Sequence, residues 1–394
     1  MRKIAVFLIP ALAVLFAAGC EVRVRPGIPP GQAYPPDAVD AVTEPSPART
    51  VIRTVVPQRE YVFYIVESGV FELPITGASG YAAIFLSLHE GASESSNVTS
   101  VLPPGQGFTI LGEYGQWWYI AVGNVTGWVL SKFCMINLPD VIPSIVYNIT
   151  NHSYSLFRSS GRDIPNITGA ALYHSRDFNA RLGREEYIAP VLYGMARKIG
   201  AAQQAALAQG NTLIMYEAFR PADAHNAVYE NLHRLHIACP IVYAGMSTPP
   251  WNTRWFLAAS PYNHQRGTAV DVSLARIDRQ EIRTSGDFAY TFVSGFTAHQ
   301  MQTPVHELSI AAVVFAAPVH SRCLTAWMDA EFADEATEGT ILLHSYMTDA
   351  GLIPLASEWW HFNDLIHTEF AVEWDITGEF HIERTYSMPP WILR

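Results

Sequence analysis

Two stretches of the sequence combine residue types that bind metal ions and transfer protons. The first contains His264 followed by Asp271, and the second contains Glu358 followed by His361. Two imidazoles and one carboxylate form a ligand set that binds Zn²⁺ and leaves one position open for a water molecule, which the ion acidifies. We therefore predict a hydrolytic site with one Zn²⁺ per chain. Its ligands are His264, Asp271 and His361. The remaining carboxylate, Glu358, is the predicted general base.

Other histidines occur in patterns that predict metal binding less well. Glu230 and His233 have the same three-residue spacing as the second stretch, but they lie in a polar helical pattern and are expected on a solvated face. His306 and Glu307 begin like the helix motif of metalloproteases, in which a second histidine follows four residues after the first. Position 310 is isoleucine, so this motif lacks its second ligand.

The elements around these stretches predict an α+β fold. Residues 184–208 carry apolar residues at helical spacing, and residues 212–216 form a strand-like apolar run. Residues 221–236 begin with a proline and continue as a second helical pattern. Helices and strands do not alternate strictly, which favours α+β over a parallel α/β sheet.

The predicted metal ligands lie next to a glycine and a strand. Residues 268–274 read as a strand with Asp271 in its middle, and Gly267 allows a tight turn that brings His264 towards Asp271. The spacing of the glutamate and histidine in the second stretch fits either a helical turn or an irregular strand end. Either arrangement places the predicted base beside its metal ligand.

Length and charge narrow the class of protein. A chain of 394 residues is long enough for two domains and a tail, and its 49% apolar composition is that of a globular protein. The formal net charge is −11, and it becomes −13 when residues 1–19 are removed, because these contain two basic residues and no acid. Nucleic-acid binding needs clustered basic residues, so we expect no nucleic-acid partner.

The amino terminus predicts export. Arg2 and Lys3 precede an apolar run that ends in small residues before Cys20, the pattern of a signal peptide over residues 1–19. The ending resembles a bacterial lipobox, which implies lipidation of Cys20 and attachment to a bacterial membrane by a lipid anchor only. The protein would then face the periplasm or the cell surface. An ordinary cleaved signal with a chance cysteine is the alternative. Residues 20–58 are rich in proline and are expected to form a tether.

Residues 59–140 predict a small β-barrel, because they contain short strand-like runs separated by glycine and proline. The runs at 86–91, 102–105, 115–119 and 127–129 resemble, in that order, those of a bacterial SH3-like domain. The resemblance implies a module that binds the cell wall. The alternative is that its aromatic residues pack in the core and the domain is a spacer.

Residues 141–394 contain three further motifs with a family resemblance. They are Tyr216 to Pro221, then His264 to Asp271, then Glu358 to Phe362. In this order they resemble the D-alanyl-D-alanine dipeptidases of the vancomycin-resistance type, within a zinc-peptidase family that also contains D,D-carboxypeptidases. The resemblance implies the metal ligands and base predicted above. It also implies that Arg220 stabilises the transition state and that the substrate is a D-Ala-D-Ala dipeptide or a peptidoglycan stem peptide.

The sequence departs from this family near the expected substrate site. Tyr262 occupies the position of a usual serine, and Ser260 lies two residues before it. We expect these two residues and Trp360 to contact the substrate. For Trp360, a place in the core or in the wall of the pocket is the alternative. The segment 272–357 is longer than in compact dipeptidases and could form a lid, reshape the pocket or be a surface excursion. Two alternatives to a dipeptidase stay open: a D,D-carboxypeptidase, and a wall-binding lipoprotein without enzymatic activity.

Overall fold

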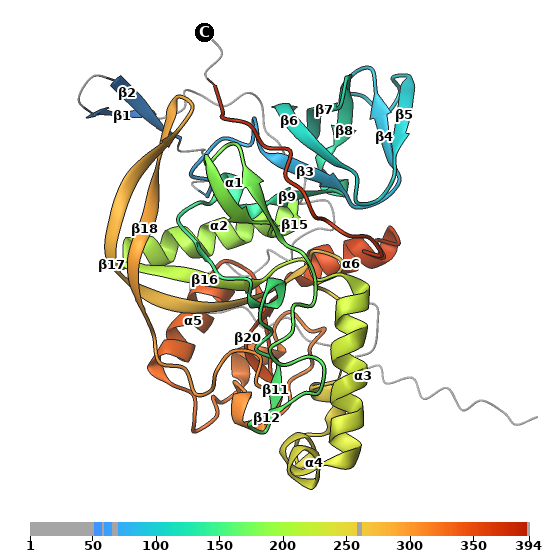
Figure 1. Cartoon of the computed structure of the whole chain (residues 1–394), viewed down its shortest axis with the longest axis vertical. Helices are drawn as coiled ribbons and strands as arrows, with labels where there is room; N and C mark the ends of the chain where they lie inside the picture. The colour runs from blue at the N-terminus through green and yellow to red at the C-terminus, as the bar shows by residue number, and fades with distance from the viewer. Residues whose placement is uncertain (1–50, 57–58, 65–69, 258–261, 392–394) are drawn as a thin grey trace, which may run out of the picture.

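The computed structural model describes residues 51–56, 59–64, 70–257 and 262–391. The expected signal peptide, the lipidation site Cys20, residues 20–50 of the tether and Ser260 lie outside the described residues. The described chain is an α+β fold, as the sequence predicted, and it contains two eight-stranded sheets. Figure 1 shows the second sheet at one end of the molecule and helices α3 and α4 at the other.

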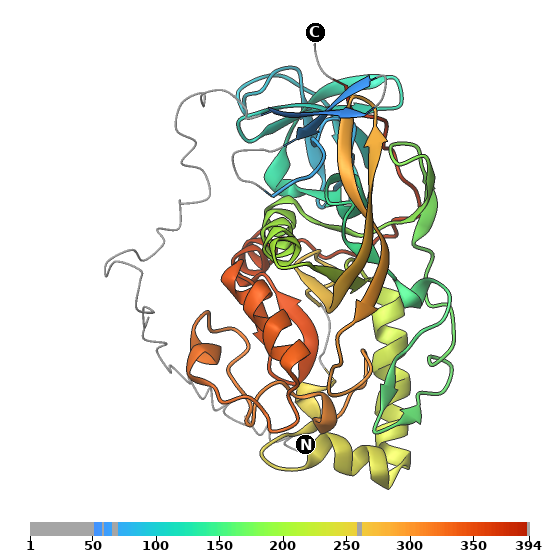
Figure 2. The ribbon, with the colours of Figure 1, turned by 90° about the vertical axis from the view of Figure 1, so that its left-hand side faces the viewer.

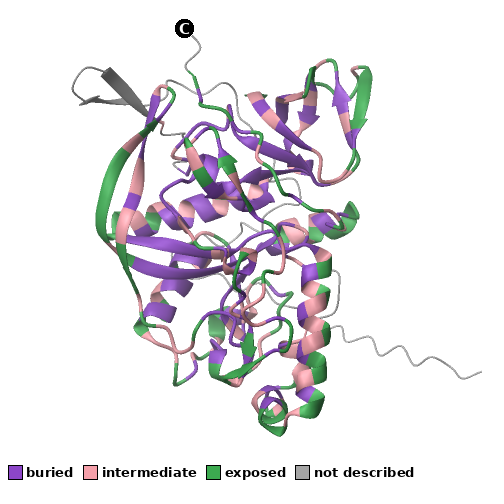
Figure 3. Cartoon of the chain, in the orientation of Figure 1, coloured by how far each residue is buried: buried purple, intermediate pink, exposed green. Residues whose placement is uncertain are grey.

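The first sheet carries the predicted metal ligands. Its strands are β1 (Val51–Val56), β2 (Arg59–Tyr64), β18 (Phe288–Ala298), β17 (Ala269–Ser285), β16 (Asn211–Glu217) and β10 (Val146–Tyr147), with β20 (Glu358–Asn363) beside β17 and β19 (Ile353–Leu355) beside β20. The first seven residues of β17 are buried, and most of the rest of the strand is exposed in a hairpin with β18 (Figure 3). Asp271 is the third residue of β17, nearer its start than predicted. Only this inner half can hold a site shielded from water.

The second sheet contains the predicted SH3-like strands. Its strands are β15 (Pro190–Leu192), β9 (Cys134–Asn137), β3 (Ser79–Ala82), β6 (Gly107–Tyr114), β7 (Trp117–Val122), β8 (Val125–Leu130), β4 (Leu86–His89) and β5 (Val98–Leu102). Trp117 and Trp118 are buried in it. These two aromatic residues pack in the core, as the alternative interpretation of this region proposed. One continuous core joins this sheet to the first.

Helices and short strands complete the fold. The helices are α1 (Leu138–Val141), α2 (Tyr193–Ala208), α3 (Ala222–Ala238), α4 (Pro240–Ser247), α5 (Glu338–Asp349) and α6 (Leu365–Glu373), and the small hairpins are β11 (Arg158–Ser159) with β12 (Arg162–Asp163) and β13 (Arg176–Asn179) with β14 (Arg184–Tyr187). Figure 2 shows α2 and α5 on the same side of the long β17–β18 hairpin. Within the described residues, no helix combines the length and apolar composition that a membrane span requires.

Three predicted elements can be compared directly with these bounds. The strand at 212–216 is β16, and the helix at 221–236 is α3, so both predictions are confirmed. The helix predicted over 184–208 begins only at residue 193, because strands β14 and β15 occupy its first part. The apolar residues of β15 are buried through pairing with β9, which the helical periodicity did not reveal.

The predicted domain boundaries also differ from the strand pairing. Strand β1 lies within the expected tether, and β2 lies within the expected SH3-like domain, yet the two pair with each other. Strand β2 then joins the first sheet through Val62, which pairs with Phe288 of β18. Strand β15 makes the reverse crossing, from the region 141–394 into the second sheet. The two regions therefore share strands instead of meeting at a single linker.

The carboxyl-terminal segment connects both regions. After α6 it runs across the second sheet (Figure 1). The backbone N–H of Tyr386 donates to Oγ of Ser79 at 2.8 Å, and that of Met388 donates to the carbonyl oxygen of Gly77 at 2.8 Å. A Cβ on Gly107 would overlap the ring of Tyr386, so the glycine provides the space for this contact.

Candidate metal centre

Three polar residues form one row across three neighbouring strands of the first sheet. Glu217 on β16 pairs in register with Asp271 on β17, and Asp271 pairs with His361 on β20. Paired residues on adjacent strands point to the same face of a sheet. All three side chains lie in the interior of the protein. The strand register therefore places one carboxylate between a second carboxylate and an imidazole.

His264 reaches this row from the loop before β17. Gly267 has a φ of +69°, and an added Cβ there would lie 3.0 Å from the backbone nitrogen of Leu192. The carbonyl oxygen of Asn263 closes the loop by accepting hydrogen bonds from the backbone N–H and the hydroxyl of Thr268, at 2.9 and 3.2 Å. The loop thus requires glycine where the sequence predicted a tight turn, and the turn points His264 at the row.

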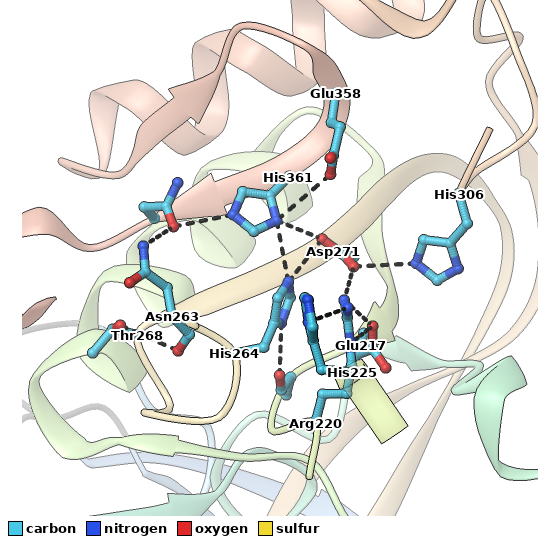
Figure 4. Close-up of polar contacts among 12 residues, drawn as sticks. Glu217, Arg220, His225, Asn263, His264, Thr268, Asp271, His306, Glu358 and His361 are labelled. Atoms are coloured by element: carbon cyan, nitrogen blue, oxygen red, sulfur yellow. Dashed lines mark hydrogen bonds and ion pairs between the residues drawn. The ribbon is translucent and has the colours of Figure 1, made fainter. Parts of the chain in front are cut away.

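Three atoms with lone pairs converge at this point. Nε2 of His264, Oδ1 of Asp271 and Nδ1 of His361 lie 3.0 to 3.2 Å from one another (Figure 4). On the far side of each ring, Nδ1–H of His264 donates to the carbonyl oxygen of Ala218 at 2.9 Å, and Nε2–H of His361 donates to Oδ1 of Asn363 at 3.0 Å. Each neutral ring therefore directs its unprotonated nitrogen at the carboxylate.

This arrangement fits a bound zinc ion. Three lone-pair atoms at such distances repel one another unless a cation lies between them. In a tetrahedral zinc site with bonds of about 2.0–2.1 Å, neighbouring ligand atoms are about 3.3–3.4 Å apart, close to the distances observed here. Hydrogen bonds that hold the outer nitrogen of each imidazole are usual for metal-binding histidines. The donor set and its spacing are therefore those of a site for one Zn²⁺.

The two imidazoles differ in their affinity for a proton. Burial lowers the pKa of His264. Burial also opposes a charge on His361, but the Asp271 carboxylate outweighs this and raises the pKa of His361. A proton on Nδ1 of His361 competes directly with a metal ion. Metal affinity is therefore expected to fall as the pH decreases, with His361 protonating before His264.

Glu358 lies beside the metal ligands, at the start of β20. Its Oε2 is 3.9 Å from Nδ1 of His361 (Figure 4). Residues three apart point to opposite faces of a regular strand, but the register between β19 and β20 shifts at Pro354 and Leu355. The irregular strand, not the helical turn, is the correct alternative. Burial raises the pKa of Glu358 to about 7, which suits a group that must both take up and release a proton.

Arg220 is held against the other oxygen of Asp271. Its Nη2 lies 3.4 Å from Oδ2 of Asp271, and its Nε donates to Oε2 of Glu217 at 2.8 Å. Asn151 and Tyr173 fix Glu217 by donating to its Oε1 at 2.7 and 2.9 Å. Burial opposes the charge of Arg220, but the two carboxylates outweigh it and raise the pKa of Arg220. The wall of the site therefore contains a permanent cation.

His306 contacts the centre from behind Asp271. It is fully buried, and its Nε2–H donates to Oδ2 of Asp271 at 3.1 Å. Its ring stacks on that of Phe157 at a centroid distance of 4.2 Å. The sequence interpretation rejected His306 because a helix motif was incomplete, and it missed this contact through the carboxylate. The feature of the sequence that could have pointed to His306 is its place in a segment without a helical pattern.

Asp271 separates two positions that favour a cation. On one side lie the three converging atoms described above. On the other side Glu217, Asp271 and His306 also bring ligand atoms within 4.8 Å of one another. The guanidinium of Arg220 contacts both carboxylates there. The second position is therefore filled by Arg220, and the first is the candidate metal site.

His225 and Tyr262 form the wall next to Arg220. Nη1 of Arg220 donates to Nδ1 of His225 at 3.1 Å, so His225 carries its proton on Nε2. Burial, together with the positive charge of Arg220, lowers the pKa of His225. The ring of Tyr262 stacks on that of His225. Both residues line the cavity over the metal ligands, where the sequence predicted a substrate contact for Tyr262.

The third predicted substrate residue has a different place. Trp360 is fully buried, lies edge-on to the ring of His306 and is not among the residues that line the cavity. Trp360 therefore lies in the core, which is the alternative place that the sequence left open for it, and not in the wall of the cavity. Alternation along β20 explains this, because His361 faces the metal centre and its neighbour faces the core behind it.

A cavity of about 860 Å³ opens over the candidate metal site. Glu358, His361 and His264 lie in its wall together with Arg220. Helix α3 and the short turn at 253–257 add apolar side chains to the wall, and α6 adds acidic ones. The predicted base, two metal ligands and the arginine thus face one space that a substrate can enter.

Comparison with known proteins agrees with this geometry. Residues 191–373 match the family model described as D-ala-D-ala dipeptidase, and residues 85–134 match the model described as bacterial SH3 domain. The D-alanyl-D-alanine dipeptidase of Escherichia coli (strain K12) is 27% identical over 197 residues, which cover 50% of this chain and 72% of that protein. The first match includes all five residues of the predicted catalytic centre. Two regions of the chain are therefore similar, in this order, to bacterial SH3 domains and to the D-ala-D-ala dipeptidase family of peptidases.

Proposed function

We propose that the peptidase domain hydrolyses D-Ala-D-Ala bonds in cell-wall peptides, with one Zn²⁺ bound by His264, Asp271 and His361. The observation that carries this proposal is the triangle of three lone-pair atoms, 3.0 to 3.2 Å apart, beside a buried carboxylate. When bound, Zn²⁺ supplies a Lewis acid that activates water and polarises the carbonyl group of the substrate. The roles of the protein's own residues follow from their positions.

Glu358 acts as the proton carrier. Its Oε2 accepts a proton from the attacking water, and the same carboxyl group then donates that proton to the nitrogen of the leaving amino acid. The raised pKa of Glu358, at about 7, keeps the energies of its two protonation states close near neutral pH. The group can therefore serve both half-reactions without a second acid.

Arg220 stabilises the negative charge that develops on the carbonyl oxygen. Its guanidinium has five N–H donors. Four of them point at Glu217, Asp271 and His225, and one on Nη1 remains for a substrate. Because the carboxylates hold the group in place, this donor needs little reorganisation during the reaction. Preorganised donors of this kind contribute about 3–4 kcal/mol to catalysis.

The proposal is tested by metal analysis and two substrates. The purified protein should contain one zinc per chain and release D-Ala from D-Ala-D-Ala or from a peptide that ends in it. Glu358→Gln should retain zinc and lose about 10²–10⁴-fold in kcat. Glu230→Gln is the matched control, because Glu230 has the same spacing to a histidine on the exposed face of α3. Bound zinc without D-Ala release from either substrate would favour the alternative of a wall-binding protein without activity.

The amino-terminal part completes the proposal. The protein is exported and anchored by a lipid on Cys20, and the SH3-like domain holds the peptidase domain near the cell wall. Support comes from the signal pattern and from the match to bacterial SH3 domains. Radiolabelled palmitate should be incorporated into the wild type and not into Cys20→Ala. Labelling of both proteins, or of neither, would contradict the lipid anchor. Binding to purified peptidoglycan tests the domain separately.

A further inference from the structure

His225 contacts the corner of the Arg220 guanidinium that no carboxylate of the described chain reaches. The nitrogens Nε and Nη2 face the carboxylates of Glu217 and Asp271. The third nitrogen, Nη1, donates to Nδ1 of His225 at 3.1 Å (Figure 4). Nη1 also carries the N–H that remains for a substrate. The partner of Nη1 is therefore the contact of Arg220 that lies nearest to the proposed chemistry.

The carboxylates alone hold the guanidinium at one point. Nε and Nη2 both contact the same atom, Oε2 of Glu217. The distance from Nη2 to Oδ2 of Asp271 is 3.4 Å, which is longer than the 2.7–3.2 Å of a usual N–H···O hydrogen bond. The ring of Phe157 covers one face of the group, with its centre 5.1 Å from Cζ of Arg220. These contacts leave the planar group free to pivot about one oxygen atom, and His225 supplies a second fixed point in the plane.

The surroundings of His225 maintain its ring as an acceptor. The ring can accept from Nη1 only as a neutral imidazole with its proton on Nε2. Burial lowers the pKa of His225, and the positive charge of Arg220 lowers it further. The backbone N–H of His225 donates to the carbonyl oxygen of Pro221 at 3.1 Å, in the first turn of α3. The start of this helix thus places the acceptor beside the arginine that precedes it.

Tyr262 holds the other side of the imidazole. Its ring stacks on that of His225. Its carbonyl oxygen accepts from the backbone N–H of Arg266 at 3.3 Å, within the turn that bears His264. The stack therefore joins α3 to the loop of a metal ligand. Tyrosine stands here where the family that the sequence resembles usually has serine, and a serine has no ring that can cover an imidazole.

We propose that His225 is a positioning residue for Arg220: its Nδ1 fixes Nη1 of the guanidinium, and the ring of Tyr262 fixes His225 in turn. This inference rests on the proposed function, because it concerns the donor that Arg220 offers to the carbonyl oxygen during hydrolysis. A displaced donor weakens the transition state more than the binding of the substrate. Loss of the contact should therefore lower kcat and leave KM nearly unchanged.

Two substitutions at position 225 separate the acceptor from the ring. His225→Phe keeps a flat ring for the stack and removes the acceptor, whereas His225→Asn keeps an acceptor oxygen near the place of Nδ1 and loses the ring. In the zinc-loaded full chain, we expect kcat to fall by about 10–100-fold in His225→Phe, with KM within about threefold of the wild type. Zinc should stay at one per chain. His225→Asn should have a kcat at least about fivefold higher than His225→Phe. His233→Phe, at an exposed position of the same helix, is the matched control and should leave both constants unchanged.

The role of Tyr262 is tested by coupling between the two residues. Tyr262→Phe keeps the ring and should retain kcat within about twofold, whereas Tyr262→Leu removes the ring and should lower kcat by about tenfold. In the His225→Phe background, Tyr262→Leu should lower kcat by no more than about a further twofold, because the ring then has no acceptor to hold in place. The prediction that Tyr262 contacts the substrate concerns its hydroxyl group and is separate from this role of its ring.

Affinities measured without turnover give an independent readout. A phosphinate analogue of D-Ala-D-Ala has a tetrahedral anionic group in place of the scissile bond and resembles the transition state. In calorimetry, His225→Phe should bind this analogue at least about tenfold more weakly than the wild type does. Binding of D-Ala-D-Ala itself, measured in the inactive Glu358→Gln background, should change by no more than about threefold when His225→Phe is added.

Several results would overturn the inference and leave the proposed function in place. They are a wild-type kcat in His225→Phe, a rise in KM without a fall in kcat, a loss of zinc that accounts for the lost activity, and a kcat in His225→Asn no higher than in His225→Phe. Additive losses in the double variant would show that Tyr262 acts independently of His225, which contradicts the second half of the proposal. If the zinc-loaded wild type cleaves neither D-Ala-D-Ala nor a peptide that ends in it, the proposed function fails together with the inference.

Discussion

The two sheets use the same strand geometry for opposite purposes. In the second sheet, the row formed by Ile110, Ile120 and Gly127 is paired in register across β6, β7 and β8 and contains no polar side chain. Burial alone stabilises such a row. In the first sheet, the corresponding row is Glu217, Asp271 and His361, and each buried polar group needs a partner.

The difference shows how many hydrogen-bond and ion-pair partners a buried polar row requires from the rest of the fold. Asn151, Tyr173 and Arg220 satisfy Glu217, and His306 satisfies the outer oxygen of Asp271. The inner oxygen faces two imidazole nitrogens and fits a cation. We therefore expect the second sheet to stay folded when the metal is lost. The polar row of the first sheet depends on partners from several distant segments.

The largest effect is expected when Asp271, the middle residue of the polar row in the first sheet, loses its carboxylate. In Asp271→Ala both imidazoles lose the anion between them, and Arg220 loses one of its two carboxylate partners. We expect zinc content to fall from one per chain to near zero and kcat/KM to fall by about 10³-fold or more. Ile282→Ala, at an exposed position of the same strand, should change neither. Full zinc occupancy in Asp271→Ala would contradict the ligand assignment.

Truncating a core residue of the second sheet should lower the stability of the protein and leave its activity unchanged. Trp118 is fully buried in β7 and packs edge-on against Tyr193, at a ring distance of 4.7 Å. In Trp118→Ala we expect the free energy of unfolding to fall by about 3–5 kcal/mol, while kcat of the folded protein stays near that of the wild type. Denaturant unfolding and active-site titration measure the two effects. Val125→Ala, at a half-exposed position, is the control.

A smaller effect is expected behind the metal centre. His306→Phe keeps a flat ring against Phe157 but removes the hydrogen bond to Oδ2 of Asp271. Loss of an outer partner of a ligand usually weakens metal binding by about 10–100-fold. Competition with a chelator measures the dissociation constant of zinc. An unchanged constant would mean that Arg220 alone orients the carboxylate, and His306 would then be a packing residue only.

The smallest effect concerns a partly buried acid between the two regions, Glu72. Burial raises the pKa of Glu72 to about 7, although hydrogen bonds from Ser144 and Gln204 oppose this rise. The folded state then holds a proton that the unfolded chain releases above its pKa of 4.5. Stability is therefore full below pH 4.5 and decreases as the pH rises to about 7. Glu72→Gln should remove this part of the pH dependence, and thermal unfolding from pH 4.5 to 8 measures it.

Local patterns predicted much of the fold around the metal centre. Pro221 marked the start of a helix because proline is favoured in the first turn, and the apolar run at 212–216 marked a buried strand. The helix predicted from 184 failed at its first part, since apolar residues there are buried by pairing with β9 and not by helical packing. Pairing between distant strands leaves no periodic signal in either partner.

The site was predictable where its residues lie in short motifs and not where they meet through space. Gly267 and its neighbours predicted a turn. The spacing of three residues between Glu358 and His361 predicted that these two side chains lie close together. His306 became part of the site only because its segment returns to Asp271 from 35 residues away. For Trp360 the sequence left two places open, because a motif does not say which of two adjacent side chains faces the cavity.

The course of the carboxyl-terminal segment has a consequence for how the chain acquires its structure. Residues near its end contact Gly77 and Ser79, about 300 positions earlier, and the carbonyl oxygens of Ile376 and Thr377 hold the loop that bears His264. Contacts between such distant parts of a chain form late. During synthesis, neither the second sheet nor the loop can be completed before the ribosome has added residues 376–388. The second sheet and the loop that bears His264 are therefore expected to reach their final form late, only once this distant segment has been made.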